Sequence, residues 1–155
     1  MNLKESKLHT TLSRIENAGF ISEDSPDTRC KVGCIIEGDG RILASGFNHA
    51  ISDGVEWDAT INKPNMPIKH AEMHALDKLS DFDVLPYKKL TAIVTKQPCY
   101  ECLVDLVSAG VKTVYYRDKS SNCWVNGPYD EFVRSNGVEL TQIDRTKFDE
   151  ANLAK

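Results

Sequence analysis

The segment from Leu90 to Tyr116 constrains the fold most, because it carries the pattern of one strand–helix–strand unit. Leu90–Thr95 and Val111–Tyr116 are compact runs rich in β-branched residues, which favour strands. Between them, leucine and valine recur at helical spacing within residues 99–109, with Pro98 before this stretch and Gly110 after it. Strands joined through a helix usually lie parallel in one sheet, so the sequence predicts an α/β fold.

The flanking segments extend this unit to the order α-β-β-α-β-α-β-α-β. Apolar residues recur at helical spacing in the first twenty positions, and Gly19 is expected to end that helix. Residues 31–37 and 41–47 are expected to form a hairpin closed by the three residues Gly38–Gly40. The other expected elements are a short helix in His70–Leu79, a helix around Tyr129–Ser135, a strand around Val138–Ile143 and a polar helix or tail over Arg145–Lys155. This order predicts a mixed sheet with helices on both faces.

The stretch from Asn48 to Pro67 contains Gly, Asp, Asn and two Pro without sustained periodicity. A loop of that length inside a compact domain is usually functional. We therefore expect this segment to line or cover a site.

Length and charge limit the classes of function. A chain of 155 residues is of the size of one domain, so residues 1–155 are expected to form a single domain. The net charge of −4 disfavours a nucleic-acid partner or an anionic membrane surface. No run approaches the roughly 18 apolar residues of a membrane span, and the N-terminus lacks a signal-peptide pattern. The expected location is the cytoplasm, with no membrane partner.

Two short motifs carry the residues best suited to chemistry. His70-Ala71-Glu72 and Pro98-Cys99-Tyr100-Glu101-Cys102 both lie at the start of a predicted helix. Cys99 and Cys102 are three residues apart, so both thiols lie on one helix face, and the imidazole of His70 would complete a set of three zinc ligands. Three protein ligands leave one coordination position for water, which is the arrangement of catalytic zinc sites. Glu72 is then the candidate group for moving protons between this water and a substrate.

Each motif alone has more ordinary explanations. A Cys-x-x-Cys pair can be a redox pair or half of a structural zinc site, and a His-x-Glu is usually an exposed helix face. A fourth thiol could close the metal site, and the candidates are Cys30, Cys34 and Cys123, of which Cys34 is better explained as a small buried residue in an apolar run. The two motifs together match the His-x-Glu and Pro-Cys-x-x-Cys signature of zinc nucleobase deaminases.

On these motifs the chain resembles the cytidine deaminase superfamily, and within it the deoxycytidylate deaminases, from about Arg29 to Val138. The run 32–36 is similar to the family's Val-Gly-Ala-Val-Ile, residues 46–48 to its Gly-Tyr-Asn, and residues 70–75 to its His-Ala-Glu-x-Asn-Ala. An acidic residue before the second cysteine, here Glu101, is typical of deoxycytidylate deaminases. The resemblance implies a three-layer α/β/α fold with a five-stranded mixed sheet, a Zn²⁺ cofactor and a homo-oligomer.

The resemblance also implies the role of each site residue. His70, Cys99 and Cys102 would bind zinc, and Glu72 would be the proton shuttle. The substrate-binding residues would be Asn48, Ala71 and Arg29. His49 and His74 are expected not to be ligands. Trp57 has no assigned role, and Trp124 is better explained by packing than by covering the site or forming a subunit interface.

The implied reaction is hydrolytic deamination of dCMP to dUMP, with a small-molecule nucleotide as the partner. A phosphate needs donors, and Arg29 or Lys31 could supply them, although an exposed charge without a ligand explains either residue equally well. The alternatives are a deaminase of a free nucleoside, of guanine or of a nucleic-acid base, and a non-catalytic module stabilised by zinc.

Overall fold

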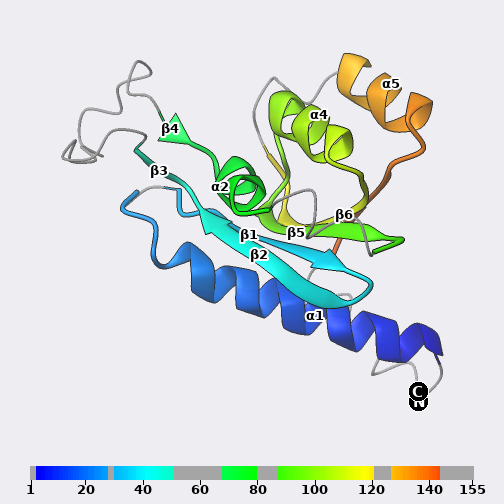
Figure 1. The fold of residues 1–155 in the computed structure, drawn as a ribbon, viewed down its shortest axis with the longest axis horizontal. Coiled ribbons are helices and arrows are strands. Elements are labelled where there is room, and N and C mark those ends of the chain that lie inside the picture. The colour runs from blue at the N-terminus through cyan, green and yellow to red at the C-terminus, as the bar shows by residue number, and fades with distance from the viewer. Residues whose placement is uncertain (1–2, 28–29, 51–67, 80–86, 121–126, 144–155) are drawn as a thin grey trace.

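The computed structural model describes residues 3–27, 30–50, 68–79, 87–120 and 127–143 (Figure 1). Its helices are α1 Leu3–Ser22, α2 Ala71–Asp77, α4 Tyr100–Ser108 and α5 Gly127–Ser135. Its strands are β1 Gly33–Gly38, β2 Arg41–Phe47, β3 His49–Ala50, β4 Ile68–Lys69, β5 Leu90–Lys96, β6 Val111–Asp118 and β7 Glu139–Gln142. In the part of the chain that is described, no helix is both long and apolar enough to cross a membrane.

Five strands form one mixed sheet in the order β2-β1-β5-β6-β7. β1 is antiparallel to both β2 and β5, whereas β5, β6 and β7 are parallel. All six residues of β1 and the first six residues of β5 are buried, as expected for central strands covered on both faces. The strand–helix–strand unit over β5, α4 and β6 is therefore confirmed, and it supplies the parallel half of the sheet.

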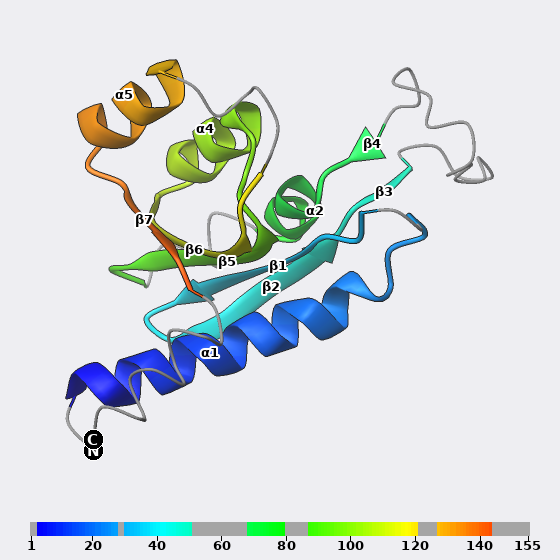
Figure 2. The ribbon, with the colours of Figure 1, turned by 180° about the vertical axis from the view of Figure 1, so that it is seen from behind.

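Helices cover both faces of this sheet, which gives three layers (Figures 1 and 2). α1 lies across one face against β1, β2 and β5, while α2, α4 and α5 lie on the other face. The main apolar cluster fills the second interface and includes Ala71 and Ala75 of α2 with Leu103 and Leu106 of α4. The expected three-layer α/β/α fold with a five-stranded mixed sheet is confirmed.

The hairpin between β1 and β2 differs from the expectation in its turn. Gly38 pairs with Arg41 as part of the sheet, so the connection has two residues and not three. Asp39 and Gly40 both have positive φ angles, 50° and 89°, as the tightest hairpin turns require. The Asp39 carboxylate also accepts hydrogen bonds from the backbone N–H groups of Lys88 and Lys89, which stabilises this turn from a distant segment.

Two further details were not expected. α1 continues past Gly19 to Ser22, so the prediction that Gly19 ends it is wrong; the Ser22 hydroxyl donates to the Gly19 carbonyl oxygen at 2.5 Å inside the last turn. His49 and Ala50, at the start of the predicted long loop, pair antiparallel with Ile68 and Lys69, which follow it directly. Residues 51–67, the C-terminal segment from Arg145, and Trp57, Cys123 and Trp124 lie outside the described residues.

Gly46 sets how closely α2 approaches the sheet. A Cβ atom at this position in β2 would lie 2.5 Å from the carbonyl oxygen of Ala71 and 2.5 Å from the backbone nitrogen of Ala75. Both neighbours are backbone atoms of α2, so no side-chain rotation can relieve the contact. Only glycine at this position allows the helix to lie directly on the strand.

We expect Gly46→Ala to lower the free energy of unfolding by about 1–3 kcal/mol or more, because the whole of α2 must move. Urea unfolding followed by circular dichroism measures the change. The control is Gly19→Ala, where the added Cβ would meet only the end of the Arg117 side chain at 3.4 Å. Since alanine is the better helix former, this control should be neutral or stabilising by up to about 1 kcal/mol. Equal losses in both variants would contradict the close contact.

Candidate active site

Two helices of the same layer begin beside each other, and their first residues bring the candidate ligands together. His70 follows β4 directly and is the N-cap of α2, and Cys99 is the N-cap of α4 after β5. Both N-caps have extended backbone, and neither side chain caps its own helix, so both are available to a ligand. Pro98 lies one residue before this N-cap, and Gly110, with φ of 106°, follows the C-cap of α4.

The ligand atoms of His70, Cys99 and Cys102 lie within 4.8 Å of one another, and this group could hold a metal ion. His70 Nδ1 is 3.2 Å from Cys102 Sγ and 3.7 Å from Cys99 Sγ. Tetrahedral zinc with Zn–N near 2.0 Å and Zn–S near 2.3 Å requires N···S separations of about 3.5 Å. The donor types and their spacing therefore both fit zinc.

The hydrogen bonds within the His70, Cys99 and Cys102 group favour the thiolate form of Cys99. A hydrogen bond from the Cys102 thiol, with a further one from His70, lowers the pKa of Cys99 to about 4. The same contact with Cys99 raises the pKa of Cys102, and burial adds to this effect. The hydrogen bond with Cys99 raises the pKa of His70. One thiolate is thus already stabilised at the N-terminus of α4, and a dication would favour ionisation of the second.

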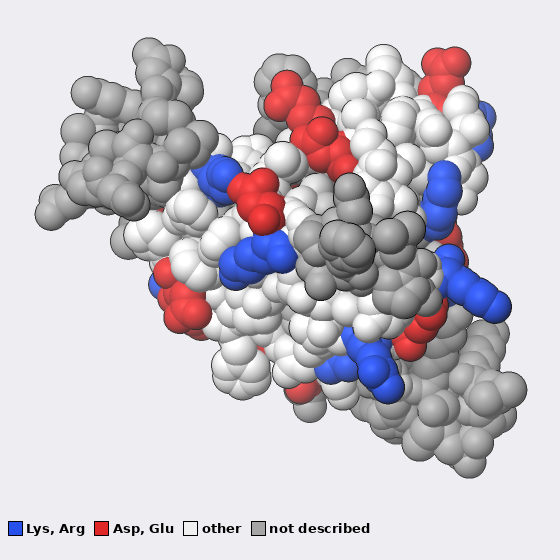
Figure 3. Space-filling view, in the orientation of Figure 1, with Lys and Arg blue, Asp and Glu red and all other residues white. Residues whose placement is uncertain are grey.

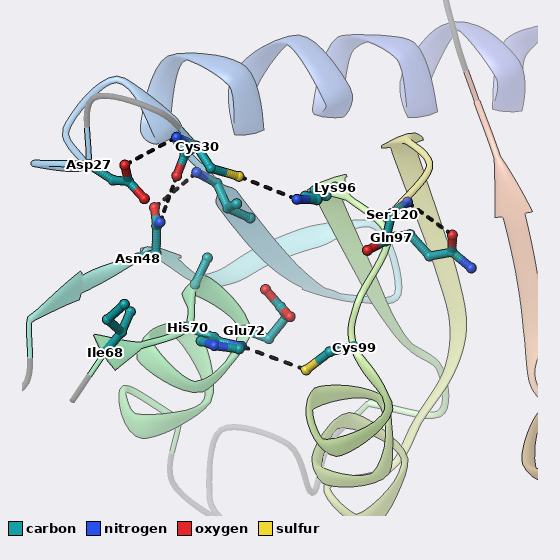
Figure 4. A pocket seen from close by; sticks show the side chains of 12 residues that line it. Asp27, Cys30, Asn48, Ile68, His70, Glu72, Lys96, Gln97, Cys99 and Ser120 are labelled. Atoms are coloured by element: carbon teal, nitrogen blue, oxygen red, sulfur yellow. Dashed lines mark hydrogen bonds between the residues drawn. The ribbon is translucent and has the colours of Figure 1, made fainter. Parts of the chain in front are cut away.

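Glu72 lies in the first turn of α2 with only 4% of its surface exposed. Burial raises the pKa of its carboxyl group, and a hydrogen bond with the Cys102 side chain acts in the opposite direction. Figure 4 shows the carboxylate directed into the space above His70 and Cys99. A carboxyl group with a raised pKa next to candidate metal-binding residues is suited to taking up and releasing a proton.

A pocket of about 220 Å³ opens over this group. It is lined by Asp27, Cys30, Val32, Asn48, Ile68, His70, Ala71, Glu72, Lys96, Gln97, Cys99 and Ser120. The structure therefore brings five of the predicted site residues to one pocket, namely Asn48, His70, Ala71, Glu72 and Cys99. Cys102 joins them through its contacts with His70 and Glu72.

Asn48 lies in the pocket wall, and its side chain also holds the wall in shape. Its Oδ1 accepts from the backbone N–H of Val32 at 2.9 Å, and its Nδ2 donates to the carbonyl oxygen of Cys30 at 2.8 Å. The Ser25 hydroxyl donates to the Asn48 carbonyl oxygen at 2.8 Å. An amide side chain has two N–H donors and two acceptor lone pairs, so these bonds still leave capacity for a ligand.

Neither of the two predicted phosphate donors is found in the pocket lining that the structure describes. Arg29 lies outside the described residues. Lys31 does not line the pocket; its ammonium group faces Glu23, 3.7 Å from a carboxylate oxygen and 3.3 Å from the carbonyl oxygen. Sequence reasoning missed Lys96, which does line the pocket. Its position, three residues before Cys99 at the end of a strand, is the signal that could have identified it.

The other cysteine and histidine side chains considered as metal ligands lie outside the group of His70, Cys99 and Cys102. Cys34 is fully buried within β1, as expected for a small core residue. Cys30 lines the pocket, but its sulfur contacts Lys96 Nζ at 3.5 Å. His74 Nδ1 accepts from the backbone N–H of Phe47, and its ring lies against that of His49 with centroids 4.5 Å apart. Among the described residues, none of these four belongs to the three-residue group that could hold a metal.

A buried tyrosine of α5 supports the segment that presents Cys99. Tyr129 is fully buried, and its hydroxyl donates to the carbonyl oxygen of Pro98 at 2.9 Å. Burial raises the pKa of Tyr129, so the hydroxyl group stays protonated and remains a donor. The backbone N–H of Gln97 donates to the Asp118 carbonyl oxygen at 2.8 Å, which ties the same segment to β6. Residues 97–99 are therefore held from two neighbouring elements.

Solved structures of deaminases have the same fold. A dCMP deaminase from the cyanophage S-TIM5 in apo form matches with a TM-score of 0.66 and 28% identity, over 92% of this chain and 99% of that one. The same enzyme in complex with dCMP and dUMP matches with a TM-score of 0.67 and 25% identity, over 92% and 98%. A bifunctional deaminase/reductase from Thermotoga maritima, at 23% identity and a TM-score of 0.63 over 88% of this chain and 37% of that one, supports the fold alone.

Sequence comparison leads to the same group of proteins. ComE operon protein 2 of Bacillus subtilis is 34% identical over 121 residues, which are 75% of this chain, and this chain spans only 61% of its length. The deoxycytidylate deaminase of phage T4 is 21% identical over 89% of this chain and 92% of its own. The family model for the cytidine and deoxycytidylate deaminase zinc-binding region matches residues 9–118, a stretch that includes the His/Cys/Cys group and Glu72. The chain therefore belongs to the cytidine and deoxycytidylate deaminase family.

Proposed function

We propose that the chain is a zinc-dependent hydrolase that deaminates dCMP to dUMP. The observation that carries this proposal is the buried carboxyl group of Glu72, which faces the same pocket as the His/Cys/Cys group. A purely structural zinc site has no use for such a carboxyl group, whereas a hydrolytic site needs a group that moves protons. This arrangement favours an enzyme over a non-catalytic zinc-stabilised module.

In the proposed mechanism, His70, Cys99 and Cys102 bind the zinc ion. Zinc held there would lower the pKa of a bound water molecule and so supply the nucleophile for C4 of the pyrimidine. Glu72 would take one proton from the attacking water and deliver it to N3, and would later carry the proton of the new C4 hydroxyl group to the leaving amine. Water is consumed, the C4–N bond breaks, and ammonia and dUMP leave. The raised pKa of the Glu72 carboxyl group suits it both to accepting a proton and to releasing one.

A nucleotide substrate is supported by similarity and by charge. The S-TIM5 dCMP deaminase matches nearly the whole of both chains, which is the reason to prefer dCMP over a free nucleoside. A polynucleotide substrate is disfavoured by the net charge of −4. On the face shown in Figure 3, Lys and Arg alternate with Asp and Glu and form no single basic stripe.

Three further expectations belong to this proposal. Residues 1–155 act as one deaminase domain, the chain assembles into a homo-oligomer, and the reaction takes place in the cytoplasm. Each stays a prediction, and none of them is needed for the chemistry at Glu72.

We expect Cys102→Ser to lose most of the bound zinc, because a hydroxyl group is a poor replacement for a thiolate ligand. Metal analysis of the purified protein measures this, and the wild type should hold about one zinc ion per chain. Cys30→Ser is the matched control, since this thiol lines the same pocket outside the metal group. Undiminished zinc in Cys102→Ser, or equal loss in Cys30→Ser, would show that the ligand set is wrong.

Glu72→Gln should keep zinc and fold but slow the release of ammonia from dCMP at least about a hundredfold, since an amide cannot shuttle a proton. The comparison with wild type uses zinc-loaded protein and steady-state kinetics. Glu101→Gln, an exposed carboxylate in the first turn of α4, is the control and should remain close to wild type. If Glu72→Gln with intact zinc turned over dCMP normally, the proton transfer would belong to another group.

A further inference from the structure

The pocket contains a cation at the end away from the candidate metal group. Lys96 is the last residue of β5, and among the described residues that line the pocket it is the one lysine or arginine. Figure 4 shows Lys96 and Cys30 on one side of the pocket, and His70, Glu72 and Cys99 on the other. The two ends of the pocket therefore differ in chemistry.

The surroundings of Lys96 leave its charge poorly compensated. Its ammonium group donates to the sulfur of Cys30 at 3.5 Å, and a thiol is a weak acceptor. No carboxylate of the described residues lies within ion-pair distance of it, whereas Lys31 pairs with Glu23 and Lys69 with Asp77. A partly buried ammonium group without an anionic partner is unfavourable, and an anionic group of a ligand would remove that cost.

The backbone holds Lys96 close in sequence and in space to the His/Cys/Cys group. Only Gln97 and Pro98 separate Lys96 from Cys99, and hydrogen bonds from Tyr129 and to Asp118 hold this segment. Gln97 also accepts from the backbone N–H of Ser120 through its side chain. This segment has a candidate metal-binding residue, Cys99, at one end and a cation, Lys96, at the other. It therefore suits a small molecule that reacts at one end and carries an anionic group at the other.

We propose that Lys96 recognises the phosphate group of the substrate and so selects a nucleoside monophosphate over a nucleoside. This inference rests on the proposed deamination of a nucleotide ring at the metal group. A lysine ammonium group is a compact charge that binds phosphate without demanding one orientation. Lys96 is thus a specificity-determining residue, and it takes the place of Lys31, whose charge is paired outside the pocket.

The test compares dCMP with deoxycytidine, which lacks only the phosphate. In Lys96→Met, which keeps the length of the side chain and removes its charge, the ratio of kcat/KM for dCMP to that for deoxycytidine should fall about ten- to a hundredfold, mainly through KM for dCMP. Lys96→Arg keeps the charge and should retain most of the wild-type ratio. Lys31→Met removes an exposed lysine of the neighbouring segment and should leave the ratio at the wild-type value.

Binding of dUMP by calorimetry separates this inference from the proposed reaction, because dUMP carries the phosphate and is not deaminated. Its Kd should rise in Lys96→Met by a similar factor. An unchanged ratio together with an unchanged Kd would overturn the assignment of Lys96. Wild-type protein that binds dUMP in a Lys96-dependent way but releases no ammonia from dCMP would instead refute the reaction and support the anion site.

Discussion

The direct contact between α2 and β2 at Gly46 is the constraint on which the site depends. Because no Cβ separates the strand from the helix, α2 lies deep against the sheet, and its first turn meets the N-terminus of α4. Ala71 and Ala75 are fully buried at this contact, so only small side chains intervene. The start of α2 then places His70 beside the two thiols and Glu72 in the pocket floor. Helix packing sets the geometry of the candidate ligands.

Burial gives the groups of this site their chemical character. Removal of Glu72 from water favours its neutral form, while neighbouring donors favour the thiolate of Cys99. A thiolate next to a buried carboxyl group is balanced best by a dication, which both sulfurs can bind. At the far end of the pocket, Lys96 offers charge for an anion. The pocket therefore combines a metal-binding end with an anion-binding end, as a nucleotide would require.

The sequence predicted those features that depend on local pattern. The strand–helix–strand unit and the ligand spacing follow from the period of the helix and from turn residues such as Gly110, and both are visible within short windows. Features set by distant partners could not be found in this way. The tight turn at Asp39 is stabilised by the backbone of Lys89, and α1, which packs on β1 and β5, continues past Gly19. The sequence offered Arg29 or Lys31 as phosphate donors, but it could not show that Lys31 faces Glu23, eight residues away. It also could not identify Lys96, because the position of that side chain depends on where β5 ends beside Cys30.

Within this family, the substrate is the property that the fold alone does not set, because relatives of the same architecture act on different bases. The most direct measurement is therefore ammonia release by the zinc-loaded wild-type chain from dCMP, CMP, deoxycytidine, dCTP and guanine under identical conditions. We expect the highest kcat/KM for dCMP, with deoxycytidine at least about tenfold lower because it lacks the phosphate. Turnover of deoxycytidine or guanine with equal or greater efficiency would contradict the nucleotide assignment.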